Sequence, residues 1–465
     1  MPNLNRRQFL AAATPAALHA QAPKRPNVIF ILADDLGWGD LGCYGNRDIQ
    51  TPNLNRLASE GTLYTQFYTS NPVCSPSRTG FMTGQYPARH RIHGHIATDE
   101  QNALRGMPNW LDPKVPFLAR TLKQAGYATA HFGKWHLGNT KNAPSPTEYG
   151  FDTHRTVNAK SPSPTWEDSA SPNFRARSTA AILDEAIAFI EKNRNGNFYI
   201  NLWTLVPHAI LNPTAEQMAP YKRFAPAGNI PHQGAKQIFY ASVTDLDNEI
   251  GRLMSKLKEL GLEQDTIVVF SSDNGPEDIH ITNASHSAIG SPGPFRGRKR
   301  SLYEGGVRVP FLVRYPARVP AKRIDDQSVI TAVDFFPTIT KLAGVPAPAN
   351  HAFDGEDRGN VLTGPPAPRK KPIHWEWRFN VAGYAYNRSP ILSVRDGNWK
   401  LLLNPDRSRV ELYDIPNDHM ELTNLADKQP QVVKRLSEMA LAWQKTLPPG
   451  PMDPEAGRNN WPMPK

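Results

Sequence analysis

The sequence has little cysteine and no long apolar run. Only two of its 465 residues are cysteine, Cys43 and Cys74, which argues against a small fold held together by disulfides. No stretch approaches the roughly 20 apolar residues of a membrane-spanning helix. Zinc-finger spacings and arginine-rich arms are also missing, so we expect neither a membrane span nor a nucleic-acid partner. The chain is 39% hydrophobic and 21% charged, which predicts a large soluble globular protein.

The N-terminus has the pattern of an export signal. Asn5 to Leu10 contain the paired arginines Arg6 and Arg7, and a weakly apolar stretch and a small-residue cleavage site follow. We expect residues 1–22 to be a twin-arginine-type signal peptide. This predicts a bacterial protein exported to the periplasm or the extracellular space. The twin-arginine export machinery carries folded proteins, so a modified residue could be installed before export.

The charge balance is positive. The formal charge is +10, and removal of residues 1–22, which hold two arginines and no acid, leaves +8. A basic surface favours anionic partners such as sulfated or carboxylated glycans. Solubility alone would also account for the charge, and the charge does not separate the two explanations.

Alternating apolar and helical segments predict an α/β fold. Four apolar runs have the composition of strands buried on both faces: 28–32, 128–132, 198–203 and 266–270. Helical patterns lie between or beside them, at 51–60, 117–125, 177–192 and 236–260. We therefore expect a large, mainly parallel sheet sandwiched by helices. Ligands bind beyond the carboxyl ends of such strands, where each of the four runs ends in polar residues.

The last part of the chain has a different pattern of predicted elements. Short strands are expected at 391–395, 399–403 and 410–414, with a helix at 431–445. They predict a small antiparallel subdomain. The proline-rich segment from Gly364 to Pro372 marks the boundary, which divides the mature chain into 23–370 and 371–465.

Acidic and amide side chains at two of the strand ends predict a cation site. Asp34 and Asp35 follow the first strand, and Asp273 and Asn274 follow the fourth. Adjacent carboxylates repel unless a cation bridges them. Oxygen ligands alone suit Ca²⁺ or Mg²⁺ rather than zinc.

Basic and imidazole side chains gather at the same predicted rim. Lys134 and His136 lie in a loop flanked by glycines, and His208 follows the third strand. A lysine supplies fixed charge for an oxyanion, and a histidine can move a proton near neutral pH. A further basic stretch contains Arg296, Lys299 and Arg300. It either closes an anion pocket or forms a solvated face.

Cys74 stands where a helix is expected to start. Ser75 is a candidate N-cap and Pro76 suits the first turn. A group at position 74 would therefore lie near the positive end of the helix. Arg78 returns to that end one turn later. A buried cysteine at a corner of the chain is the simpler interpretation of these residues alone.

The longer pattern changes that interpretation. Cys74-Ser75-Pro76-Ser77-Arg78, followed by Thr79-Gly80, resembles the signature of the type I sulfatases, the formylglycine-dependent family of the alkaline phosphatase superfamily. The resemblance extends from Pro26 to about Leu425. It implies that a formylglycine-generating or equivalent maturation enzyme oxidises Cys74 to formylglycine. The hydrate of that aldehyde would be the nucleophile on sulfur. An exported protein could pair Cys43 with Cys74, but both lie in stretches that match the family pattern without a disulfide, so we expect none.

The resemblance also implies roles for the other residues. A cation, most often Ca²⁺, would contact residue 74 and be held by Asp34, Asp35, Asp273 and Asn274. Arg78 and Lys134 would orient the hydrate, and Lys299 would neutralise sulfate oxygens. His208 would protonate the leaving alcohol, and His136 would take a proton from the second hydroxyl of the hydrate.

The substrate is less well specified. Export and positive charge favour a sulfated glycan or oligosaccharide, and 273–306 is similar to N-acetylgalactosamine-6-sulfatases. Candidate substrate contacts are His93, His95, Arg296 and Arg300. The segments 139–173 and 276–292 and the C-terminal subdomain would select the sugar. Two alternatives stay open: a formylglycine-dependent phosphonate or phosphodiester hydrolase, and a non-catalytic protein that binds sulfated glycans.

Overall fold

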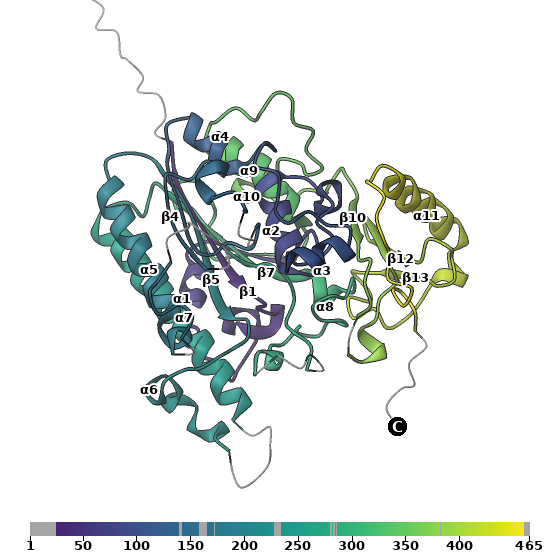
Figure 1. Ribbon diagram of the computed structural model, residues 1–465, viewed down its shortest axis with the longest axis horizontal. Coiled ribbons are helices and arrows are strands. Elements are labelled where there is room, and N and C mark those ends of the chain that lie inside the picture. The colour runs from purple at the N-terminus through teal and green to yellow at the C-terminus, as the bar shows by residue number, and fades with distance from the viewer. Residues whose placement is uncertain are drawn as a thin grey trace, which may run out of the picture.

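The computed structural model describes residues 25–459, apart from 139–141, 158–164, 172, 227–233, 280, 282–283, 285 and 382. The predicted signal peptide, 1–22, lies outside the described residues, as do parts of the segments 139–173 and 276–292. The described residues form a large sheet with helices on both faces and a small antiparallel sheet beside it (Figure 1). This architecture confirms the predicted fold class.

The large sheet has nine strands, in the order β4-β3-β5-β1-β6-β7-β2-β8, with β9 also paired to β2. The strands are β1 (Asn27–Asp34), β2 (Thr62–Tyr68), β3 (Ala128–Lys134), β4 (Thr153–Val157), β5 (Phe198–Pro207), β6 (Thr266–Ser272), β7 (Arg308–Arg314), β8 (Arg323–Asp325) and β9 (Ile330–Thr331). The four predicted strands are the adjacent parallel strands β3, β5, β1 and β6. Only β7 runs antiparallel to its neighbours.

Helices cover both faces of this sheet because the central strands are apolar on both faces. Every residue of β1 and β5 is buried. One face packs against α1 (Pro52–Ser59), α5 (Phe174–Asn193) and α7 (Ala235–Glu259). The other packs against α2 (Cys74–Thr83), α4 (Leu118–Gln124), α9 (Phe335–Leu342) and α10 (Gly359–Thr363). The short helices are α3 (Asp99–Leu104), α6 (Ala215–Met218) and α8 (Glu304–Val307).

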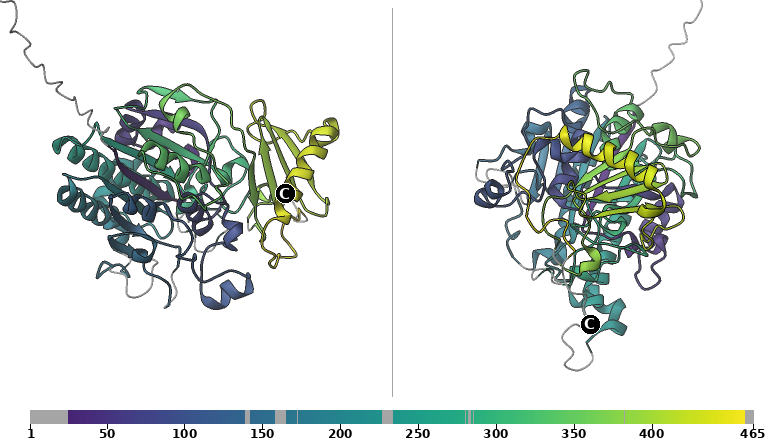
Figure 2. Two further views of the ribbon diagram at one scale, coloured as in Figure 1. Left: turned by 90° about the horizontal axis from the view of Figure 1, so that it is seen from above. Right: turned by 90° about the vertical axis from the view of Figure 1, so that its right-hand side faces the viewer.

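The C-terminal sheet is antiparallel, in the order β10-β11-β12-β13. Its strands are β10 (Ile373–Glu376), β11 (Leu392–Asp396), β12 (Trp399–Leu403) and β13 (Val410–Asp414), and α11 (Pro430–Lys445) packs on one face. Figure 2 shows this sheet and α11 as a separate lobe beside the large sheet. The sequence predicts three of the four strands and misses β10. The proposed boundary at residue 370 stays a prediction.

A buried network of charges joins the two lobes. Lys400 of β12 places Nζ 2.9 Å from Oε1 of Glu304 and 2.9 Å from Oε1 of Glu421, and all three side chains are fully buried. Tyr68 donates its hydroxyl hydrogen to Glu304 at 2.7 Å. Burying a charge is costly unless it is paired, so this network holds α8 against the small sheet.

Both cysteines are free. Over the described residues, none of the helices combines the length and apolarity needed to cross a membrane.

Substitution of Lys400 tests the network. We expect Lys400→Met to lower the free energy of unfolding by about 3–5 kcal/mol, because Glu304 and Glu421 would lose the cation that they share. Urea unfolding followed by tryptophan fluorescence measures the change. Lys428→Met, which removes an exposed lysine from the same lobe, is the control. Equal stability of the two variants would contradict a structural role for the network.

Candidate active site

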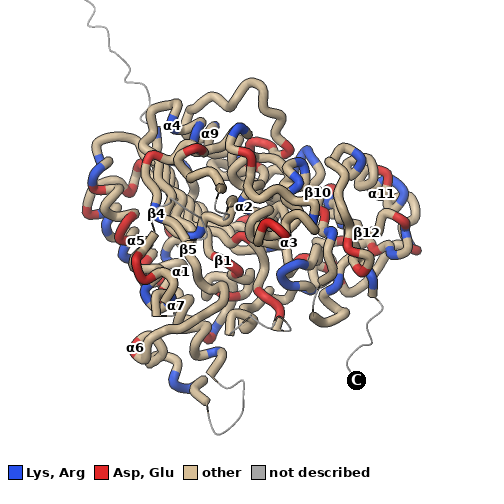
Figure 3. The backbone as a smooth tube through the Cα atoms, viewed as in Figure 1, with Lys and Arg blue, Asp and Glu red and all other residues tan. Residues whose placement is uncertain are grey.

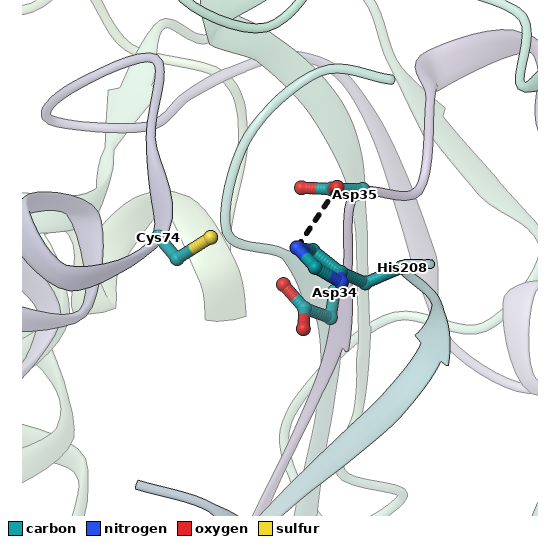
Figure 4. A group of neighbouring side chains, drawn as sticks. All are labelled: Asp34, Asp35, Cys74 and His208. Carbon is teal, nitrogen blue, oxygen red and sulfur yellow. Dashed lines mark ion pairs between the residues drawn. The ribbon is translucent and has the colours of Figure 1, made fainter. Parts of the chain in front are cut away.

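The carboxyl ends of four parallel strands meet at one rim of the large sheet. Asp34 ends β1, Lys134 ends β3, His208 follows β5 and Asp273 follows β6. Because these strands are neighbours, their terminal side chains converge. Cys74, Asp34, Asp35 and His208 each offer a ligand atom, and these atoms lie within 4.8 Å of one another (Figure 4). The structure thus brings together residues that are far apart in the sequence.

Each buried aspartate at the rim has its own cation. Lys134 Nζ lies 2.6 Å from Asp34 Oδ2. Lys299 Nζ donates to both oxygens of Asp35, at 2.6 and 2.7 Å. Arg78 donates from Nε and Nη2 to Asp273 Oδ2, at 3.0 and 2.7 Å. The three pairs are neutral together, so a bound divalent cation would leave the site with a net charge of +2.

The pKa values of the carboxyl groups diverge. Burial opposes ionisation of Asp34, but Lys134, His208 and Arg78 together hold its pKa well below the usual range. Burial raises the pKa of Asp35, and the charge of Lys299 offsets only part of this increase. Burial and the nearby Asp34 raise the pKa of Asp273 to about 6. The raised pKa values of Asp35 and Asp273 show that their paired cations do not fully offset burial and mutual repulsion, so added positive charge would stabilise the ionised carboxylates.

Two buried oxygens at the rim have no hydrogen-bond donor among the described residues. Asp34 Oδ1 and Asn274 Oδ1 accept no hydrogen bond from the described residues. Unsatisfied buried oxygens are costly, and together with Asp35 and Asp273 they form the all-oxygen set that suits Ca²⁺ or Mg²⁺. The residues therefore fit a divalent cation.

Cys74 is the first residue of α2, and its side chain points toward Asp34, Asp35 and His208 (Figure 4). The sequence prediction of the cap was wrong: Val73 is the N-cap and Ser75 lies inside the helix, where its Oγ accepts a hydrogen bond from the Ile96 N–H at 3.0 Å. A proline is tolerated throughout the first turn, so Pro76 did not fix the start. Burial raises the pKa of the Cys74 thiol to about 12, so an unmodified Cys74 stays a neutral thiol.

Arg78 is held rigidly behind Cys74. Its side chain is fully buried, its Nη1 donates to the Lys134 carbonyl at 3.1 Å, and its guanidinium lies 4.9 Å from the ring centroid of Trp203. The close packing of β3 and β5 beneath it depends on Gly133, which has a φ of 105° and leaves no room for a Cβ against the Trp203 carbonyl. This rigidity fixes the positive charge beside residue 74.

His136 has one ring nitrogen available as a base. Burial, reinforced by Lys134 and His95, lowers its pKa well below the usual value, so the ring is neutral. Nε2 lies 3.2 Å from the Ile96 carbonyl. A carbonyl accepts hydrogen bonds only, so Nε2 carries the proton. The buried Nδ1 has no hydrogen-bond partner among the described residues and can accept a proton.

His208 is oriented by the backbone of the next residue. Nδ1 lies 2.7 Å from the Ala209 carbonyl and therefore carries a proton, and Nε2 lies 3.8 Å from Asp35 Oδ2. Burial lowers the pKa of His208 to about 3, although Asp34 opposes the shift. A role as a general acid therefore requires the negative charge of a substrate to raise that pKa.

The four predicted substrate contacts separate into two groups. His95 lies beside His136, with 6.4 Å between ring centroids, and Arg300 pairs with Glu277 next to Lys299. The other two make their contacts elsewhere, and their role in binding substrate stays a prediction. His93 is buried with Nδ1 3.6 Å from Glu376 Oε2 in the small sheet. Arg296 stacks on Tyr303 and donates to the Tyr386 carbonyl.

Sequence reasoning missed Glu277. This buried carboxylate accepts hydrogen bonds from Arg300 and lies 3.5 Å from Lys299 Nζ. Lys299 and Arg300 hold its pKa at about 2 against the opposing effect of burial. The signal was the Lys299-Arg300 pair itself, because adjacent buried cations need acidic partners.

The comparisons with known proteins agree with this geometry. A family model described as Sulfatase matches residues 26–345, and one described as N-sulphoglucosamine sulphohydrolase, C-terminal, matches 295–445. The canine N-acetylgalactosamine-6-sulfatase is 32% identical over 93% of this chain and 88% of its own length. The N-acetylgalactosamine-6-O-sulfatase of Bacteroides thetaiotaomicron is 28% identical over 90% of this chain and 93% of its own.

One solved structure adds a bound oligosaccharide. Ps i-CgsB, solved in complex with k-i-k-neocarrahexaose, superposes with a TM-score of 0.73 at 26% identity. The alignment covers 90% of this chain and 93% of the other.

The unpartnered oxygens predict a cation-dependent stability. We expect saturating Ca²⁺ to raise the melting temperature relative to EDTA, since binding at 100 times Kd adds about 2.7 kcal/mol. We expect Asp34→Asn to lose most of that increase, because it keeps an oxygen ligand but removes the negative charge that attracts the cation. Asp325→Asn is the control: it alters another buried aspartate with an unpartnered oxygen that is outside the cluster. Full Ca²⁺ stabilisation of Asp34→Asn would place the cation elsewhere.

Proposed function

The chain belongs to the sulfatase family of sulfuric ester hydrolases, and from that membership we propose that it hydrolyses sulfate esters of a sulfated glycan or oligosaccharide, using formylglycine derived from Cys74 and a bound Ca²⁺ ion. The observation that carries the proposal is the position of Cys74. Cys74 is the first residue of α2, and its Sγ lies within 4.8 Å of ligand atoms of Asp34, Asp35 and His208.

The chemistry of residue 74 requires modification. The hydrated aldehyde supplies an oxygen nucleophile for sulfur and a second hydroxyl through which sulfate is later expelled. A neutral thiol supplies neither. Asp34, Asp35, Asp273 and Asn274 would hold the cation, which supplies positive charge to the sulfate oxygens. All the side-chain donors are oxygens, which suit Ca²⁺ or Mg²⁺; we propose Ca²⁺ because it is the ion most often found in the family.

The remaining residues hold charge and move protons. Arg78 and Lys134 flank residue 74 with fixed positive charge, the kind of electrostatic stabilisation that commonly dominates such transfers. Lys299 Nζ, which donates hydrogen bonds to Asp35, would donate to a sulfate oxygen instead when substrate is bound. His136 Nδ1 would accept a proton from residue 74, and His208, once protonated, would give one to the leaving alcohol.

The substrate class rests on charge and on relatives. Two relatives are named for sulfate on N-acetylgalactosamine and a structural neighbour was solved with an oligosaccharide. The chain itself carries a formal charge of +10, which favours a polyanionic substrate. His95 and Arg300 are the residues that we expect to contact the sugar.

Maturation and location complete the proposal. A formylglycine-generating or equivalent enzyme would oxidise Cys74 in the cytoplasm, and the twin-arginine machinery would then export the folded protein to the periplasm or beyond.

A phosphonate or phosphodiester hydrolase is the second candidate. It would use a similar nucleophile and a similar cluster of charges. The amide of Asn274 favours the sulfatase, because the other class usually has a histidine among its metal ligands. Turnover of an aryl sulfate, compared with that of an aryl phosphodiester and an aryl phosphonate, separates them: preference for either phosphorus ester would favour the second candidate.

Replacement of Cys74 tests the nucleophile. We expect Cys74→Ala, produced with the maturation enzyme, to lose sulfate release by a factor of about 10⁴ or more across a panel of position-defined sulfated sugars. The wild-type peptide should show the mass of a cysteine that has exchanged sulfur and two hydrogens for one oxygen. Cys43→Ala, which alters the other free cysteine, should keep full activity.

Equal activity of Cys74→Ala and wild type would overturn the mechanism. An unmodified Cys74 with no turnover of any ester would support a binding protein instead.

A further inference from the structure

A cavity lies between the two sheets, apart from the cluster around Cys74. It measures about 570 Å³, and none of its lining residues belongs to the cluster at the rim. Its walls come from Thr65 and Gln66 of β2, from the segment that joins β8 to β9, from the start of β10 and from the ends of β11 and β13. This volume is that of a site for a small ligand rather than for a single ion.

The cavity arises from an irregularity at the edge of the large sheet. β8 pairs with residues 62–64 of β2 and β9 pairs with residues 67–68. Between these pairings, Thr65 and Gln66 have no parallel neighbour, and the ladder with β7 also shifts there. The gap follows from the way in which β8 and β9 pair with β2, so the cavity is a feature of the fold itself.

The lining of the cavity is strongly basic. It includes Arg308, Arg369, Lys371 and Arg395 but only one acid, Asp326. Figure 3 shows Lys and Arg segments in blue beside β10, where the sheets meet.

Arg308 and Arg395 are held in place from behind. Arg308 bonds Glu304 at 3.1 Å and the Thr65 carbonyl at 2.6 Å. Arg395 bonds the Tyr68 hydroxyl and, at 2.7 Å, Gln66. These contacts fix the positive charge at the cavity wall.

The other two cations, Arg369 and Lys371, do not use all their N–H groups in hydrogen bonds to the described residues. Arg369 has only 6% of its side chain exposed and pairs with Asp334, but its Nη2 lacks a hydrogen-bond partner among the described residues. Lys371 Nζ donates only to the carbonyls of Phe353 and Gly355, at 2.8 and 2.9 Å, and pairs with no acid in the described part of the chain. Both residues line the cavity, and Lys371 keeps a third N–H for an anion bound there.

We infer that this cavity binds a sulfate group carried by a sugar of the glycan, at a distance from the site of hydrolysis. The inference rests on the proposed function for the class of ligand. Four cations select an oxyanion, while Thr65, Gln327 and Asn398 offer hydrogen-bonding side chains to sugar hydroxyls. A polymer held here would be retained between successive cleavages, whereas a monosaccharide would gain nothing.

The test adds negative charge without removing any cation. Gln327 and Asn398 line the cavity, are exposed and make no side-chain hydrogen bond to the described residues. In a Cys74→Ala background, we expect Gln327→Glu with Asn398→Asp to weaken binding of a size-defined chondroitin sulfate decasaccharide roughly fivefold or more by calorimetry. Gln431→Glu, an exposed change on α11, is the matched control. Binding as tight as in the control would overturn the inference.

A second variant removes the positive charges of Arg369 and Lys371. Arg369→Gln with Lys371→Gln should weaken decasaccharide binding similarly, and its melting temperature shows whether the fold is intact. In the active enzyme, the Gln327→Glu/Asn398→Asp pair should raise KM for the polymer and leave kcat/KM for a sulfated monosaccharide unchanged.

Two further outcomes are decisive. Inorganic sulfate that binds the cavity as tightly as the decasaccharide, at matched ionic strength, would make this a site for the free ion and overturn the glycan assignment. The binding measurement needs no turnover, so it separates the two proposals. Sulfate release with unaltered binding in the cavity variants refutes only the cavity. Absence of release from every sulfated sugar, with cavity-dependent binding intact, refutes only the proposed function.

Discussion

The rim of the large sheet depends on the pairing of three buried carboxylates with three buried cations. Asp34, Asp35 and Asp273 would repel one another without Lys134, Lys299 and Arg78. Each partner comes from a different element, so the pairs also fix where β3, α2 and the loop before α8 meet the ends of β1 and β6. The same charges that secure the fold are those that a sulfate ester and a cation would engage. Stability and chemistry therefore compete for the same side chains.

Much of this arrangement could be predicted from the sequence. Near-continuous apolar runs identify β1, β3, β5 and β6, because strands buried on both faces leave no polar alternation. Parallel strands then place Asp34, Lys134, His208 and Asp273 at one rim. The catalytic interpretation of Cys74 needed the longer family pattern, because a cysteine before a proline has many structural explanations.

Other features were beyond reach because they depend on long-range contacts. β10 is only four residues long and contains His374 and Glu376, yet all four residues are buried. β7 contains Pro310, which ordinarily argues against a central strand; here the β2 ladder shifts opposite it. His93 and Arg296 have the composition of substrate contacts, and the structure pairs them with Glu376 of β10 and with the Tyr386 carbonyl between β10 and β11, both more than 80 residues away in sequence.

The buried triad of Lys400, Glu304 and Glu421 has a consequence for how such enzymes can be recombined. Glu304 is separated by only four residues from Lys299, and its cation is supplied by the other lobe. A chimera that joins this large sheet to the C-terminal sheet of a relative would keep Glu304 but replace the lobe that supplies its partner, Lys400. Exchange of substrate specificity by lobe grafting thus has to carry the triad as one unit, or redesign all three positions together.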